Sequence, residues 1–123
     1  MNDETTTIAQ LRQLIADFIA ERQWRGYHDA KNLSMSIAIE AAELMEHFQW
    51  ARSDELPALL RDQARRAEVI DEVADIACYL LSLANALEID LSAAVVAKVA
   101  RNARKYPPER FRGRYFKPEG DGA

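Results

Sequence analysis

Apolar residues recur at helical spacing over most of the chain, and this periodicity constrains the fold more than any other feature. Four long segments show it, at about residues 7–23, 33–50, 63–87 and 91–105. Between the second and third of these segments, a proline with capping residues before it leaves room for a short extra helix at 54–61. No stretch shows the alternation that is typical of a strand. The sequence therefore predicts an all-α fold, an antiparallel four-helix bundle with short connections.

The C-terminal part of the chain differs in composition from the periodic segments. Pro107 and Pro108 follow the last of these segments, and the residues after them hold three of the four glycines and few aliphatic side chains. Prolines end a helix because they remove backbone donors, and segments poor in aliphatic residues bury little surface. We therefore expect a single helical domain over residues 1–107 and an extended or partly disordered tail over 108–123.

Length and composition favour a single soluble domain. The chain has 123 residues, of which 49% are hydrophobic, and no apolar run approaches the roughly 20 residues that cross a membrane. Its first residues are polar and acidic, unlike a signal peptide, so we expect a cytoplasmic protein without a membrane partner. The single cysteine, Cys78, excludes an intrachain disulfide and has no partner for a zinc motif.

The net charge of −4 conceals an asymmetry along the chain. Residues 1–97 hold 8 basic and 17 acidic side chains, whereas residues 98–123 hold 8 basic and 3 acidic side chains. Long nucleic acids normally select a broad basic surface, which this acidic body does not offer. A small anion that is bound through a cation, with help from a local basic cluster, agrees better with this distribution.

Two pairs of acidic residues lie at a spacing of three inside the second and third periodic segments. Glu40 and Glu43 form one pair, and Glu72 and Asp75 form the other. Residues three apart lie on the same side of a helix, so the two pairs face each other if their helices pack. Mg²⁺ prefers carboxylate oxygens, and a cation would compensate the repulsion within each stripe. The alternative is that each stripe is only the solvated face of an amphipathic helix.

Two further polar residues lie close to the first acidic pair. Glu46 is turned by about 120° from Glu40 around the helix, which favours a role beside the ligands or as a general base. His47 lies four residues after Glu43, and a lone histidine there is more often a surface or supporting residue than a metal ligand. A di-iron carboxylate bundle would need a Glu-x-x-His step from two of its helices, and the sequence has none.

These acidic pairs and their surroundings resemble the MazG-like, all-α nucleotide pyrophosphohydrolases, most closely the small dCTP pyrophosphatase branch. The signature of that family is E-x-x-E, followed further along the chain by E-x-x-D. Here it reads Glu40-Ala41-Ala42-Glu43 and Glu72-Val73-Ala74-Asp75. Matching blocks contain Trp24, His28, Lys31 and Asn32 before the second segment, and Lys98, Asn102, Lys105 and Tyr106 at the end of the fourth. The resemblance covers about residues 8–107.

The resemblance implies a hydrolase that cleaves a nucleoside triphosphate between the α and β phosphates, releasing a monophosphate and pyrophosphate. It implies Mg²⁺, with Mn²⁺ as a substitute, and a homodimer or homotetramer that acts on a dCTP-type pyrimidine deoxynucleotide in house-cleaning or pool control. Glu46, if close to the attacking water, would be the catalytic residue that accepts its proton. The implied metal ligands are Glu40, Glu43, Glu72 and Asp75. The implied substrate-binding residues are Trp24, His28, Lys31, Asn32, Trp50, Tyr79, Lys98, Asn102, Lys105 and Tyr106.

Several of these residues could instead have a purely structural role. Trp24 and Trp50 could serve only to cover the ends of the bundle, and basic residues in the last turn of a helix are favoured by the helix dipole alone. Members of the family often have a proline where this chain has Ala30, and that departure leaves the preferred base open. Two alternative functions are a non-catalytic helical interaction or regulatory module and a phosphoribosyl-ATP-type pyrophosphohydrolase.

Overall fold

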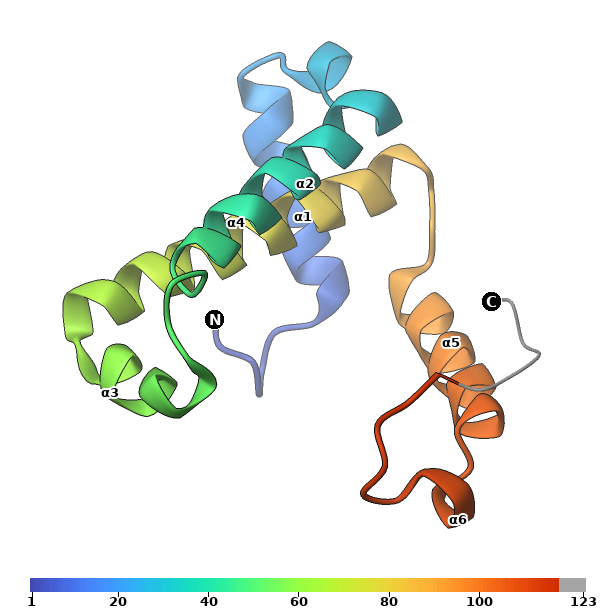
Figure 1. Cartoon of the computed structure of the whole chain (residues 1–123). Helices are drawn as coiled ribbons and strands as arrows, with labels where there is room; N and C mark the ends of the chain where they lie inside the picture. The colour runs from blue at the N-terminus through green and yellow to red at the C-terminus, as the bar shows by residue number, and fades with distance from the viewer. Residues whose placement is uncertain (118–123) are drawn as a thin grey trace. The chain divides into compact units, whose positions relative to one another are not determined.

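The computed structural model describes residues 1–117 and shows an all-α fold (Figure 1). Within these residues there is no strand, so the predicted fold class is confirmed. The chain divides into two compact units, Met1–Ile89 and a second unit that begins at Asp90. The first unit contains α1 (Ile8–Glu21), η1 (Arg25–Tyr27), α2 (Ala30–Glu46), η2 (Ser53–Glu55), α3 (Leu56–Arg61) and α4 (Gln63–Ala86), where η denotes a 3₁₀ helix. The second unit contains α5 (Leu91–Lys105) and α6 (Pro108–Phe111).

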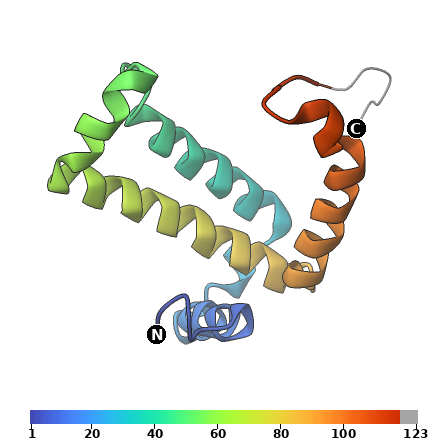
Figure 2. The ribbon, with the colours of Figure 1, turned by 90° about the horizontal axis from the view of Figure 1, so that it is seen from below.

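Helices α2 and α4 form the centre of the first unit. They run side by side in opposite directions, and α1 crosses α4 (Figure 2). The buried apolar side chains in residues 1–117 are Ile19 from α1, Leu33 from α2, and Leu81 and Ala84 from α4. Their burial holds the three helices together near the C-terminal end of α4. The middle of the α2–α4 pair is therefore less deeply buried and has room for polar groups.

Short polar side chains fix where the helices begin. Thr7 caps α1 in a capping box, since its hydroxyl accepts from the Gln10 N–H at 3.1 Å and the Gln10 amide oxygen accepts from the Thr7 N–H at 2.7 Å. Asp62 caps α4 by accepting from the backbone N–H groups of Ala64 and Arg65. Each cap satisfies donors that a helix leaves unpaired in its first turn, and both helices begin close to their predicted starts.

The limits of α2 differ from the prediction, which placed this helix later in the chain. The helix begins at Ala30 because the Asp29 carboxylate caps it, accepting from the Asn32 N–H at 2.8 Å. The irregular connection before α2 is therefore shorter than expected. At its other end α2 stops at Glu46, and the residues from there to Trp50 form turns. Apolar spacing continues past the end of this helix, so periodicity alone misplaced it.

The second unit consists of α5, α6 and a cluster of aromatic side chains. Asp90 caps α5, since its carboxylate accepts from the Ala93 N–H at 3.0 Å. Tyr106 and Phe116 pack against Phe111 at ring-centroid distances of 5.1 Å and 4.5 Å. These ring contacts fold the chain after α5 back onto its last turn.

The sequence predicts one domain up to residue 107 and an extended or partly disordered tail after it. Part of that tail, Pro108–Phe111, forms the one-turn helix α6. Residues 118–123 of the tail lie outside the described residues. The domain boundary itself stays a prediction.

No single helix in residues 1–117 is both long and apolar enough to cross a membrane. Length and composition meet that criterion only when α4 and α5 are taken together. Core helices of folded domains meet it as well, so the pair carries no conclusion about a membrane.

Candidate active site

Three carboxylates meet between α2 and α4. Glu40 and Glu43 lie one turn apart on α2, and Glu72 lies on α4. One oxygen atom from each of these residues lies within 4.8 Å of the other two. The antiparallel pairing of two helices that both carry acidic residues brings the side chains together. We call these three residues the acidic cluster.

The pKa of Glu40 is raised by the neighbouring carboxylates of the acidic cluster. A hydrogen bond with Glu72 raises the pKa of Glu40 from 4.5 to about 7, and burial, Glu43 and the charge of Asp75 act in the same direction. The Oε2 atoms of Glu40 and Glu72 are shielded from solvent, and neither has a hydrogen-bond donor in residues 1–117 when both groups are ionised. A carboxyl proton on Glu40 supplies the missing donor. In the absence of a cation, the cluster is therefore stabilised by a proton held between two carboxylates.

The acidic cluster fits a divalent cation. Its potential ligand atoms are carboxylate oxygens, which hard cations prefer. A cation would replace the shared proton, give both shielded oxygen atoms a partner and remove the repulsion between like charges. Among residues 1–117, the salt bridges do not involve Glu40, Glu43 or Glu72, so no basic side chain already neutralises them. The cluster is thus consistent with a divalent metal site.

An aromatic-lined cavity of about 470 Å³ lies beside the acidic cluster. Asp75, the fourth predicted metal ligand, lies outside the cluster, one turn beyond Glu72, and lines this cavity. Tyr79 stacks on His28 with ring centroids 6.4 Å apart, while Trp24 meets Phe18 edge-on at 5.9 Å. The full lining is Leu14, Ile15, Phe18, Ile19, Trp24, His28, Asp75, Cys78, Tyr79 and Ser82. We call this space the aromatic cavity.

Tyr79 connects the aromatic cavity to the acidic cluster. Burial raises the pKa of its hydroxyl, and the negative charges of Glu40 and Asp75 raise the pKa further. The hydroxyl therefore keeps its proton at neutral pH and stays a hydrogen-bond donor. A ligand in the cavity would meet aromatic faces together with this donor, next to the carboxylates.

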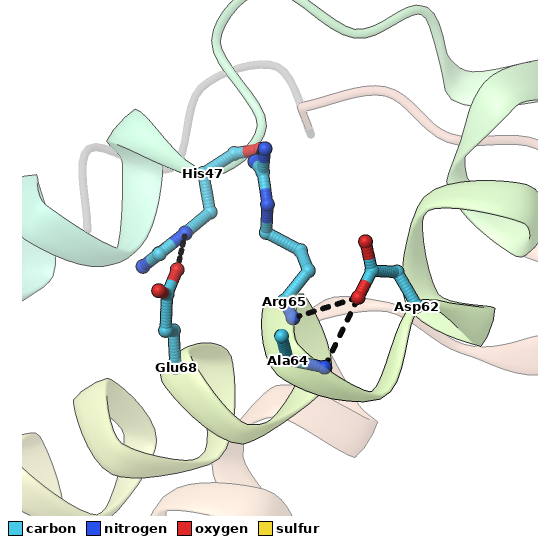
Figure 3. Close-up of polar contacts among 5 residues, drawn as sticks. All are labelled: His47, Asp62, Ala64, Arg65 and Glu68. Atoms are coloured by element: carbon cyan, nitrogen blue, oxygen red, sulfur yellow. Dashed lines mark hydrogen bonds and ion pairs between the residues drawn. The ribbon is translucent and has the colours of Figure 1, made fainter.

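The C-terminal end of α2 is fastened to the start of α4 by polar side chains (Figure 3). The Nδ1 atom of His47 lies 3.8 Å from Oε2 of Glu68. Arg65 donates to the backbone carbonyl of His47 at 3.3 Å, and Asp62 caps α4 at the same place. We call His47, Asp62, Arg65 and Glu68 the clasp. The clasp holds the two helices together about one turn away from the acidic cluster.

Several predicted site residues of the first unit belong neither to the acidic cluster nor to the lining of the aromatic cavity. Glu46 is exposed at the C-terminal end of α2. Trp50 is 89% exposed and is not among the residues that line the aromatic cavity. Lys31 is exposed near the start of α2, and Asn32 uses its side-chain amide to donate to the Tyr27 carbonyl at 3.2 Å. The first unit does not gather these four residues around the cavity, and their roles stay predictions.

Four predicted substrate-binding residues belong to the second unit. Lys98, Asn102 and Lys105 share one face of α5, as their spacing predicts. The side chains of Lys98 and Asn102 are exposed. The Lys105 ammonium group lies 5.6 Å from the centre of the Tyr106 ring, in a cation–π contact. Their role toward a substrate stays a prediction.

Sequence reasoning names four of the ten residues that line the aromatic cavity and misses the other six. Phe18 and Cys78, which it does not propose as site residues, both line the cavity. It does not single out Ser82, although this residue lies three positions after Tyr79 and seven after Asp75. That spacing places Asp75, Tyr79 and Ser82 on one face of a helix, and it is the signal from which Ser82 could have been predicted.

Comparison with known proteins identifies the family. The MazG-like family matches residues 35–114, a range that includes both acidic pairs. The chain belongs to the MazG-like family. The resemblance read from the sequence is thus confirmed, and the MazG-like helical fold is confirmed by a solved structure with a closely similar backbone.

MazG-like relatives share much of this sequence. The chain is 37% identical over 107 residues to dCTP pyrophosphatase 1 from Bos taurus, and 38% identical over 108 residues to the protein of that name from Rattus norvegicus. Each match covers 87% of this chain and 63% of the relative, so the chain spans less than two thirds of their length. A pyrophosphatase from Archaeoglobus fulgidus is 41% identical and superimposes with a TM-score of 0.77, covering 87% of this chain and 98% of that one.

Proposed function

We propose that this protein is a Mg²⁺-dependent nucleoside triphosphate pyrophosphohydrolase. In this proposal it cleaves between the α and β phosphates and releases a nucleoside monophosphate and pyrophosphate. The observation that carries the proposal is the acidic cluster, with its shielded and unpartnered oxygen atoms, beside an aromatic cavity. A nucleotide combines an aromatic base with phosphates that proteins commonly hold through Mg²⁺, so one molecule matches both parts. The names of the relatives, dCTP pyrophosphatase 1 and pyrophosphatase, agree with this reaction.

Glu40, Glu43 and Glu72 would hold the cation, with Asp75 as the fourth ligand from the next turn of α4. When bound, the ion would screen the phosphate oxygens, lower the pKa of the attacking water and stabilise charge on the leaving pyrophosphate. Because Asp75 also lines the aromatic cavity, phosphates at the carboxylates would leave the base on the cavity side. Glu46 would accept the proton of the attacking water.

The substrate that we propose is a dCTP-type pyrimidine deoxynucleotide, in house-cleaning or pool control. Trp24, His28 and Tyr79 line the aromatic cavity with flat faces on which a base can stack. Its volume of about 470 Å³ lies within the range of small-ligand sites, about 300–1,000 Å³. The relatives named dCTP pyrophosphatase 1 support a cytosine base over a purine.

We also propose that the protein acts as a homodimer or homotetramer. The helix pair that carries the acidic cluster leaves large apolar side chains exposed, with Ile39 at 58%, Met45 at 68%, Ile70 at 53% and Val73 at 51%. Exposed apolar residues in such number on one pair of helices are typical of a surface that another chain covers. Light scattering should give a multiple of the 13.9 kDa chain mass, and a monomeric mass at working concentration would contradict this proposal.

Product analysis tests the reaction. The protein is incubated with each of the eight common ribo- and deoxyribonucleoside triphosphates and Mg²⁺, and the phosphorus products are separated. We expect dCTP to be consumed fastest, giving dCMP and pyrophosphate, and we expect a chelator to stop the reaction. The matched control is Glu72→Gln, which removes one carboxylate of the acidic cluster without changing side-chain size.

Three outcomes would contradict the proposal. Formation of dCDP and phosphate would refute the position of cleavage. A preference for purine nucleotides would favour the phosphoribosyl-ATP-type alternative. Equal or absent turnover in the wild type and in Glu72→Gln, with no effect of Mg²⁺ on stability, would favour the non-catalytic helical module.

A further inference from the structure

Ser82 is a buried polar residue on α4 whose hydroxyl contacts a distant part of the chain. It is 4% exposed, and its neighbours Leu81 and Ala84 belong to the apolar core. In residues 1–117 its hydroxyl has one hydrogen-bond partner, Nδ1 of His28 at 2.9 Å, 54 positions away in the sequence. This contact joins the connection before α2 to the cavity face of α4.

The burial of Ser82 decides the direction of this hydrogen bond. A serine hydroxyl has one proton, and a buried donor without an acceptor is strongly disfavoured. If His28 donated from Nδ1, the Ser82 proton would have no acceptor among the described residues. Among the described residues, the arrangement that satisfies both groups has the Ser82 hydroxyl donating and Nδ1 of His28 accepting.

This direction fixes the state of the imidazole ring. A neutral imidazole that accepts at Nδ1 carries its proton on Nε2, so that atom becomes a donor. Within residues 1–117, Nε2 of His28 makes no hydrogen bond, and its N–H is free for a ligand. The ring of His28 also stacks on Tyr79 and lines the aromatic cavity.

The ring depends on few contacts for its orientation. His28 and Ser82 line both the aromatic cavity and a second cavity of about 460 Å³. The ring therefore borders open space in both cavities. A hydrogen bond from a rigid helix is then the contact that selects one orientation and one tautomer.

We infer that Ser82 is a positioning residue that holds His28 as its Nε2–H tautomer, so that the ring donates to an acceptor atom on the substrate's base. The inference rests on the proposed function, because it deepens what the aromatic cavity recognises. The group that this Nε2–H would recognise is the edge of a base that carries a carbonyl oxygen or an unprotonated ring nitrogen. A base that presents only donors at this edge would leave the Nε2–H group unpaired and would be rejected.

The tautomer is measured directly by ¹⁵N NMR of the imidazole nitrogens in the free protein. The chain has two histidines, so the His47→Gln variant leaves His28 as the single signal. We expect an Nε2–H ring at neutral pH in this variant. Adding Ser82→Ala should turn the signal into an average of both tautomers, whereas Ser34→Ala should leave it unchanged. Ser34 is a suitable control because, among residues 1–117, its hydroxyl bonds only to the backbone carbonyl of Lys31.

Kinetics on the preferred triphosphate provide the second measurement. Ser82→Ala should raise KM about three- to tenfold and leave kcat within about twofold, since the contact is to the base and not to the reacting phosphates. The inference would be overturned if His28 carried its proton on Nδ1 in the protein that retains Ser82. It would also be overturned if KM were unchanged in Ser82→Ala. Absence of turnover in the wild type would instead overturn the proposed function, and the NMR result would still decide how Ser82 holds the ring.

Discussion

The clasp and the acidic cluster, two neighbouring stretches of the α2–α4 pair, differ in whether basic side chains lie beside their carboxylates. In the clasp, Glu68 meets His47, and Arg65 donates to the backbone at the end of α2. About one turn further along both helices, the acidic cluster brings Glu40 and Glu72 together without a basic partner in residues 1–117. A proton on Glu40 takes the place of that partner.

The difference distinguishes the acidic cluster from a stripe of independently solvated carboxylates. Carboxylates on a solvated stripe keep their ordinary pKa values, whereas the pKa of Glu40 is raised to about 7 by its hydrogen bond with Glu72. Basic side chains occur at the neighbouring turn, where Arg65 lies in the clasp. Carboxylates with a perturbed pKa and no basic partner in residues 1–117 are candidates for a functional site.

The largest expected effect comes from removing one carboxylate of the acidic cluster. Glu43→Gln or Glu72→Gln should lower kcat/KM by at least about a thousandfold, because a cation ligand supplies several kcal/mol of transition-state stabilisation. Steady-state kinetics with dCTP and Mg²⁺ measure this loss, and circular dichroism should show an intact helical fold. The matched control is Glu68→Gln in the clasp, for which we expect kcat/KM within about twofold of wild type. Equal losses in both stretches would remove the distinction between them.

A smaller effect is expected on the pH dependence of stability in the metal-free protein. The pKa of Glu40 is about 7 in the folded chain and 4.5 as an isolated group, so between these values the folded state binds more protons than the unfolded state. Stability therefore falls as pH rises through this window. Thermal melts in a chelator at pH 5, 6, 7 and 8 should show this decline, and Glu40→Gln should flatten it. Parallel curves for Glu40→Gln and wild type would contradict the raised pKa.

The smallest effect is expected from the clasp. Glu68→Gln removes a carboxylate that is 65% exposed and that forms an ion pair with His47 only when the imidazole is protonated, so it should lower the free energy of unfolding by less than about 1 kcal/mol. Chemical denaturation measures the change, which salt should reduce further because the pair is near the surface. A loss of several kcal/mol would mean that the clasp, and not the apolar core, holds α2 against α4.

Helical spacing predicts the acidic cluster because the position of a residue on a helix face depends only on its near neighbours in the sequence. Residues three apart on a helix share a face whatever the rest of the chain does, so Glu40 with Glu43 could be paired before the fold was known. The packing of α2 against α4 then needs only the apolar pattern of each helix. Asp75 shows the limit of this reasoning, since it follows the same spacing but lines the aromatic cavity outside the cluster.

Contacts between distant segments could not be predicted in this way. The bond between His28 and Ser82 spans 54 positions, and it depends on how the connection before α2 lies against α4. Trp50 lies beyond the end of α2 with its side chain 89% exposed, and its predicted role toward the substrate stays a prediction. In both cases the deciding factor is the path of a non-helical segment, for which a periodic pattern carries no information.

The most direct test of the central claim is the number of protons released when Mg²⁺ binds. Calorimetric titrations of the nucleotide-free protein in two buffers of different ionisation enthalpy give this number at each pH. Because a cation at the acidic cluster would displace the Glu40 proton, whose pKa is about 7, proton release per bound ion should be larger at pH 6 than at pH 8. Glu72→Gln should abolish both binding and release, and Glu68→Gln should change neither. Binding without proton release at pH 6, or binding that survives Glu72→Gln, would contradict the claim that the cluster is the cation site.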